Sequence, residues 1–175
     1  GGGVVGGVGW GRALALAATD QLDEARATLG ELRALVAAAP ADAPAGMNTI
    51  KSVLGVGIPI VEARIALAEK HPAVSISLLR QAVQNEDQLA YNEPSDWLFP
   101  ARHVLGAQLL QAHRASEAEA VYREDLKHNP ANGWALHGLS AALKAQGKTQ
   151  EAAQYSRQFD TAWKNSDITL SASAF

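Results

Sequence analysis

The sequence predicts an all-α fold, arranged as a right-handed solenoid of about four antiparallel helix pairs. Alanine, the strongest helix former, supplies 35 of the 175 residues. The C-terminal part of the chain also repeats itself at one fixed interval, which pairs Leu105 with Leu139, Leu109 with Leu143, and Ala118 with Ala152. This interval is 34 residues. A repeat of this length is typical of two-helix units that bury their apolar faces by stacking on one another.

The N-terminal segment does not fit this pattern. Six of the first ten residues are Gly, and each Gly inside a helix costs about 1 kcal/mol relative to Ala. We therefore expect residues 1–9 to be disordered, or to be an artefact of processing or cloning, and the helical repeat domain to cover residues 10–165.

The first unit is expected over residues 10–40. Ala13 provides the small residue at which two helices approach closely, Asp20 lies at the turn, and Ala25 packs from the second helix. The segment "AAAPADAPAGMN" follows, and its Pro and Gly residues are typical of a loop. This loop accounts for about 16 residues beyond the regular period of the repeats.

The second unit is expected over residues 48–88. Ala63 takes the place of Ala13, the sequence Lys-His-Pro at 70–72 forms the turn, and Ser75 packs from the second helix. The next unit begins about 9 residues later than the period requires. The additional residues belong to a predicted inserted loop at 84–99, and insertions in repeat arrays often emerge on the binding face.

The last two units, residues 98–130 and 131–165, match each other most closely. In the first of them Gly106 is the small contact residue, Ser116 and Glu119 form a capping box for the second helix, and Pro130 ends the unit. The remaining residues, 166–175, are apolar and uncharged after Asp167. They are expected to form a tail, or a cap folded back on the last unit.

These units resemble the tetratricopeptide repeat, and the run "YNEPSDW" through "GWAL.GL..AL.AQGK..EA" is similar to the C-terminal part of longer bacterial proteins of that family. The resemblance covers about residues 9–165 and implies that upstream repeats are missing from this chain. It implies an interaction scaffold whose first helices line a concave surface for a protein or peptide. It carries over no catalytic residue.

Composition argues against several other functions. The net charge is −3 and no run of Lys and Arg is present, whereas phosphate binding needs clustered cations. No apolar run is long enough to span a bilayer. Because the chain has no Cys, disulfides and Cys-based metal centres are excluded, but the compartment, cytoplasm or periplasm, is not determined.

Two histidines occupy equivalent repeat positions. His103 and His137 are separated by the same interval as Leu105 and Leu139, so they are expected on neighbouring first helices, pointing to the same side. They could hold a metal ion together with Glu93 or Asp96, or could be partly exposed groove residues that contact a partner. Neighbouring helices lie about 8–10 Å apart, which is far for two imidazoles to share one ion.

Other candidate side chains surround the inserted loop. Arg102 could bind a ligand carboxylate, or could pair with Glu93 or Asp96 and fasten the loop. The aromatic side chains of Tyr91, Trp97 and Trp134 could anchor a partner or attach the loop to the repeats. Lys144 lies one turn beyond the small contact residue of the last unit, on the face expected to be concave.

The sequence therefore predicts a non-catalytic scaffold that binds a protein or peptide through the concave face and the loop at 84–99. No cofactor is indicated, and homodimerisation through an exposed end of the array is a further option. The alternative interpretation is a repeat protein that binds a small molecule or metal ion around Arg102, His103 and His137.

Overall fold

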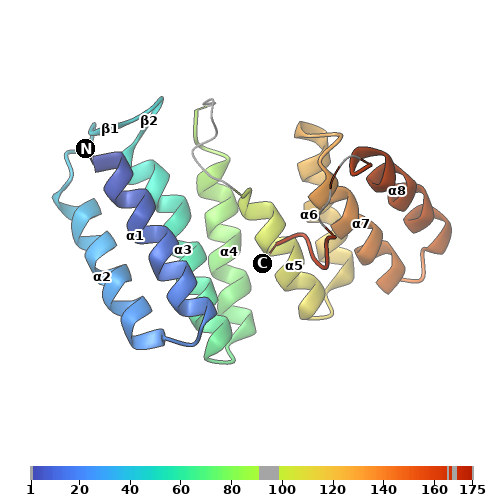
Figure 1. The fold of residues 1–175 in the computed structure, drawn as a ribbon, viewed down its shortest axis with the longest axis horizontal. Helices are drawn as coiled ribbons and strands as arrows, with labels where there is room; N and C mark the ends of the chain where they lie inside the picture. Colours follow the sequence, from blue (N-terminus) through green and yellow to red (C-terminus); the bar gives the residue numbers. More distant parts are fainter. Residues whose placement is uncertain (1, 91–98, 165, 167–168, 175) are drawn as a thin grey trace. The chain divides into compact units, whose positions relative to one another are not determined.

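The computed structural model describes residues 2–90, 99–164, 166 and 169–174, with side chains from residue 9 onward. These residues form eight helices in four consecutive pairs (Figure 1). The helices are α1 (Gly2–Ala18), α2 (Leu22–Ala38), α3 (Ile50–Ala68), α4 (Pro72–Glu86), α5 (Ala101–Gln111), α6 (Ala115–His128), α7 (Gly133–Ala145) and α8 (Thr149–Ala162). The predicted all-α class and its four helix pairs are confirmed.

The chain divides into two compact units rather than one domain over residues 10–165. Unit 1 is Gly1–Ala101 and contains α1 to α4. Unit 2 is Arg102–Phe175 and contains α5 to α8. Each unit therefore consists of two helix pairs.

All four pairs turn from the first helix to the second in the same way. The residue two positions beyond each first helix has a positive φ: Asp20 (58°), Lys70 (63°), His113 (58°) and Gly147 (74°). The residue after each turn donates a backbone hydrogen bond of 2.8–3.0 Å to a carbonyl five positions earlier. This pattern is that of a Schellman C-cap.

The small contact residues follow the same spacing as these turns. Ala13, Ala63, Gly106 and Ser140 on the first helices are buried, and so are their partners twelve residues later: Ala25, Ser75, Ala118 and Ala152. Ser140 differs from the others because its hydroxyl donates to the Ala152 carbonyl at 3.0 Å. The same spacing of twelve residues between buried small residues therefore holds in all four helix pairs.

The turns provide a matched test of backbone strain. Left-handed backbone costs a non-Gly residue about 1 kcal/mol, so His113→Gly is expected to stabilise unit 2 by about 0.5–1 kcal/mol. Gly147→Ala, at the equivalent turn, should destabilise it by about 1 kcal/mol. Urea denaturation followed by circular dichroism measures both. Equal signs for the two changes would contradict this view of the turns.

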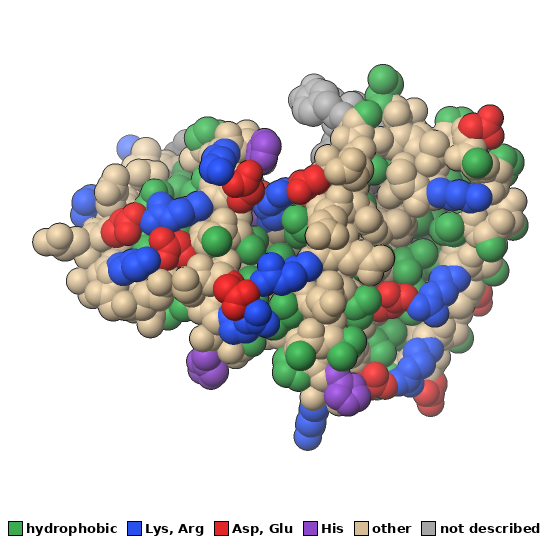
Figure 2. Space-filling model, turned by 180° about the vertical axis from the view of Figure 1, so that it is seen from behind, with side chains coloured by type: hydrophobic (Ala, Val, Ile, Leu, Met, Phe, Trp, Pro, Cys, Tyr) green, Lys and Arg blue, Asp and Glu red, His purple; other side chains and the backbone are tan. Residues whose placement is uncertain are grey.

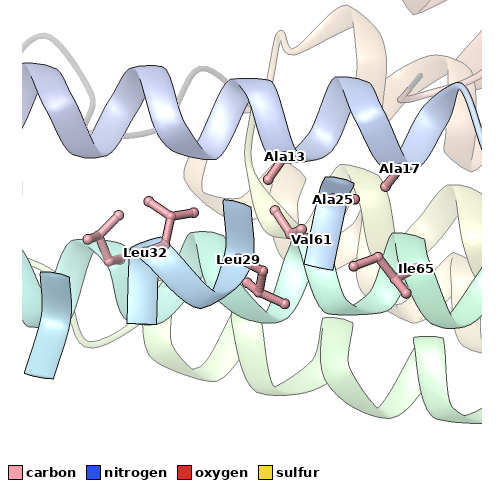
Figure 3. Packing of buried hydrophobic residues seen from close by; sticks show 8 residues of the cluster. Ala13, Ala17, Ala25, Leu29, Leu32, Val61 and Ile65 are labelled. Atoms are coloured by element: carbon pink, nitrogen blue, oxygen red, sulfur yellow. The ribbon is translucent and has the colours of Figure 1, made fainter. Parts of the chain in front are cut away.

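The core of unit 1 lies between α1, α2 and α3. In Figure 3, Ala13 and Ala17 from α1 face Leu29 and Leu32 from α2, with Val61 and Ile65 from α3 beside them. The small alanines let α1 approach closely, and the larger side chains fill the space between the helices.

The prediction of disorder was wrong for residues 2–9, which are helical and belong to α1, and the alternative of an artefact of processing or cloning stays a prediction. Gly9 lies against Leu32, since a Cβ at this position would be 3.0 Å from the Leu32 Cδ2 atom. Close packing of α1 on its neighbours supports helical backbone that the low propensity of Gly would not support in isolation.

The predicted loop between the first two pairs contains a short hairpin. Its strands are β1 (Pro44–Ala45) and β2 (Asn48–Thr49), joined through Gly46 with φ 61°. Thr49 then caps α3, because its hydroxyl accepts a hydrogen bond from the Ser52 amide at 3.1 Å.

The charged surface is mixed. On the face drawn in Figure 2, Lys and Arg side chains lie next to Asp and Glu side chains rather than in a patch of one sign. Within the described part of the chain, none of the helices has the length and apolar character needed to cross a membrane.

Candidate functional site

Tyr122 organises the interior of unit 2. It extends from α6, is fully buried, and its ring contacts the faces of Gly106 on α5 and Gly138 on α7. A Cβ atom at either glycine would come closer to the ring than two carbon atoms can approach. The ring and its hydroxyl group therefore fill the space between the two first helices.

The C-terminal tail meets that hydroxyl group. Ser173 is buried, its side chain hydrogen-bonds to Tyr122 Oη, and it donates to the His103 carbonyl at 3.0 Å. Burial raises the pKa of Tyr122 to about 12, although the hydrogen bond with Ser173 opposes this shift. Tyr122 is thus a neutral hydrogen-bonding group at every physiological pH.

His137 contacts the same tail one helix further on. The backbone of Ser171 lies near its ring and acts to raise its pKa, and the ring lies 5.2 Å from the ring of Phe159. Burial lowers the pKa of His137, the positive charge of Lys144 lowers it further, and the backbone of Ser171 opposes both. His103, Tyr122 and His137, from α5, α6 and α7, form what we call the tail-binding surface. Figure 1 shows the tail returning from α8 across α7 toward α5.

The prediction of His103 as a partly exposed groove residue was wrong. Its side chain is only 3% exposed, and its Nε2 atom lies 3.0 Å from Oδ2 of Asp125, which is 5% exposed. The imidazole is therefore engaged inside unit 2, and only the backbone carbonyl of His103 reaches the tail.

The repeat explains why the two histidines differ. Asp125 and Phe159 are separated by the same interval as His103 and His137, so they occupy equivalent positions on the second helices. His103 faces a carboxylate from α6, whereas His137 faces an aromatic ring from α8. The same repeat position therefore carries a buried polar pair in one helix pair and a ring contact in the next.

Trp134 belongs to an aromatic cluster of the last pair. Its ring packs edge-on against Trp163 at 5.8 Å, and Trp163 stacks on Phe159 at 5.6 Å. Gly133 leaves room for Trp163, because a Cβ atom there would collide with that ring. Trp134 is half-buried, so the cluster closes the end of α7 and α8 and leaves an edge of the indole for contact.

Lys144 lies at an open cavity of about 520 Å³. The cavity is lined by Lys144, Thr149, Ala153, Ser156 and Arg157. Among these described lining residues two are cationic and none is acidic, which suits a carboxylate. The positive charge of Lys144 also lowers the pKa of His137.

Several predicted residues cannot be assigned a place. Tyr91, Glu93 and Trp97 lie outside the described residues, as does half of the loop predicted at 84–99, whose first residues belong to α4. Arg102 is half-buried on α5, and its positive charge is one of those that lower the pKa of Glu124 on α6.

The alternative of a metal site gains no support. Among the residues described, no three His, Asp or Glu side chains are grouped as ligands for one ion. The Nε2 atom of His103 is already bonded to Asp125, so it is not available to bind a ligand together with His137.

Glu119 links α6 to the last pair. Its carboxylate accepts hydrogen bonds from Lys148 and Gln146, each at 2.7 Å, and from Arg123 at 2.9 Å. Arg123 in turn pairs with Glu151 on α8. These donors, Lys148 foremost, lower the pKa of Glu119 to about 2.

Glu119→Gln is expected to lower the free energy of unfolding by about 1–3 kcal/mol at pH 7. Because the pKa of Glu119 is lower in the folded chain, its stabilisation is complete above about pH 4.5 and disappears as the pH falls to about 2. Urea denaturation at several pH values should therefore show the two proteins converging in acid. The exposed Glu117, paired with Arg114 at 2.6 Å, is the control, and Glu117→Gln should change stability little.

The tail-binding surface was largely missed by sequence reasoning. Ser171 and Ser173 carry no motif, and Tyr122 was not predicted as a contact of the tail. The one sequence feature that indicated these contacts was the lack of charge in the tail, which is consistent with a segment that folds back on the last unit.

Comparison with known proteins supports the fold. A solved structure described as "Crystal structure of MamA protein" is similar to this chain, with a TM-score of 0.55 and 13% sequence identity over 92% of this chain and 78% of that one. At this identity the similarity shows the fold alone, a helical solenoid of tetratricopeptide type. No protein-family model and no curated protein matches the sequence.

Proposed function

We propose that this chain is a non-catalytic binding module that holds a polypeptide segment of another protein on the tail-binding surface. The observation that carries the proposal is the tail itself, because a non-helical segment of polypeptide already lies on this surface. The helical-repeat fold, whose helices follow one another in four pairs, is consistent with such a role.

The contacts favour a polypeptide over a small molecule. The backbone of Ser171 lies near His137 and acts on its pKa, and the Ser173 hydroxyl donates to a backbone carbonyl of α5. Backbone contacts of this kind are available from any polypeptide, whereas the buried position of Ser173 accepts only a small side chain. The partner segment is therefore expected to present Ser or Ala at that position.

The cavity at Lys144 favours a partner segment that carries a negative charge. Lys144 and Arg157 line it, and both are cationic. A partner with an Asp or Glu near its small residues would place that carboxylate against these two side chains. Binding should then weaken as the salt concentration rises, because such pairs are partly exposed.

A peptide with the sequence of residues 169–174, labelled with a fluorophore, provides the probe. It is added to the full chain carrying Ser173→Glu, which removes the tail from the surface. Fluorescence anisotropy should show saturable binding, and an added His137→Leu change should weaken it about fivefold, because the polar ring beside the peptide backbone is lost. Lys127→Ala, at an exposed position of α6, is the control and should leave binding unchanged. Absence of saturable binding would refute the proposal.

A further inference from the structure

The tail and a partner segment would need the same atoms. Ser173 uses the Tyr122 hydroxyl and the His103 carbonyl, and the backbone of Ser171 lies near the His137 ring. With Ser173 only 4% exposed, little of its contact area remains accessible to a second segment. Both segments cannot occupy the tail-binding surface at once.

We propose that residues 169–174 are an intramolecular ligand that blocks the tail-binding surface until a partner segment displaces them. This inference rests on the proposed function of that surface. The device is autoinhibitory: the chain binds its partner only in the fraction of molecules whose tail has left.

The composition of the tail suits a ligand that can be displaced. Its residues are Thr, Leu, Ser, Ala, Ser and Ala, without a charge or an aromatic ring. Leu170, Ala172 and Ala174 are half-buried, and Thr169 and Ser171 are exposed. Only Ser173 is buried, so most of the tail adds little apolar contact, and its attachment depends on proximity to α8.

Proximity sets the expected strength of the block. The tail begins seven residues after the end of α8 at Ala162, and a short tether of this kind gives an effective concentration on the order of millimolar. If the same segment binds in trans with a dissociation constant of about 0.1 mM, the attached tail reduces apparent affinity about tenfold.

The experiment compares full-length wild-type chain with Ser173→Glu, using the labelled peptide of residues 169–174. Glutamate cannot be accommodated at the buried position next to a carbonyl oxygen, so the tail should leave. Thr169→Glu places the same charge at an exposed position of the same tail and serves as the control. Hydrogen exchange of residues 169–174 reports whether the tail is bound, and circular dichroism reports whether the helices are intact.

We expect the peptide to bind Ser173→Glu about ten times more tightly than wild type or Thr169→Glu. Exchange of the tail amides should be slow in those two proteins and fast in Ser173→Glu. If Ser173→Glu does not fold, Ser173→Ala, which removes only the hydroxyl contacts, should still give a smaller increase in peptide affinity and faster exchange of the tail.

Two results would overturn the inference, and they differ in what they say about function. Equal peptide affinity for wild type and Ser173→Glu would mean that the tail does not block the surface, while the surface still binds polypeptide. Absence of binding to an intact Ser173→Glu chain with a released tail would mean that the tail is a structural cap. That second result would also refute the proposed function.

Discussion

Replacing Asp125 with Ala is expected to lower the free energy of unfolding of unit 2 by about 2–4 kcal/mol. The change leaves the Nε2 atom of His103 without its partner in a site where both side chains are at most 5% exposed. An unsatisfied buried polar group costs about 1–3 kcal/mol, and a broken buried ion pair costs more. Urea denaturation followed by circular dichroism measures the effect.

The double change His103→Leu with Asp125→Leu distinguishes loss of the pair from loss of volume. Two apolar side chains leave no polar group unsatisfied, so the double variant should be more stable than either single replacement by alanine. Additive destabilisation by the two leucines would show that the hydrogen bond between the two side chains contributes nothing. The exposed pair of Lys127 and Glu124 is the control, because its loss should cost less than about 1 kcal/mol.

Gly138→Ala is the second change with a large expected effect, a loss of about 2–3 kcal/mol. The added methyl group collides with the ring of Tyr122, and that ring cannot move away because Gly106 contacts it at the same atoms. Tyr122 is fully buried and bonded to Ser173, so relief requires displacement of α7 or of the tail.

The control is another helical glycine. Nothing lies within 4 Å of a Cβ atom built on Gly30, so Gly30→Ala should stabilise unit 1 by about 0.5–1 kcal/mol through helix propensity alone. Thermal unfolding of both variants provides the comparison. If Gly138→Ala costs as much in the Tyr122→Leu background as in the wild type, the collision with the ring is not the cause of the loss.

The fold was predictable because its determinants recur along the chain. The small residues at 13, 63, 106 and 140 mark where each first helix meets its partner, and each lies seven residues before the turn. The regular period of 34 residues between positions 106 and 140 is readable without knowing any tertiary contact, and the wider spacings before them are those of the two predicted loops. The helical state of residues 2–9 was not predictable in this way, because packing on α2 and α3 outweighs the low propensity of Gly.

The candidate site was less predictable. The repeat does not predict which residue of the second helix faces each histidine. His103 faces Asp125, whereas His137 faces Phe159 at the equivalent position of the next pair. The tail has no periodic pattern, so its contacts with α5, α6 and α7 arise only in the folded chain. Lys144 and Trp134 were chosen correctly as residues of the last pair, but their roles as partner contacts stay predictions.

The most direct test of the central claim is to locate a bound segment. A peptide with the sequence of residues 169–174 and a photoreactive group at the position of Ser171 is irradiated with the Ser173→Glu chain. Crosslinked residues are then identified by mass spectrometry. The account predicts crosslinks to α7 near His137, lost on competition with unlabelled peptide. Crosslinks confined to unit 1, or a yield of crosslinks no higher than that of a scrambled peptide, would contradict it.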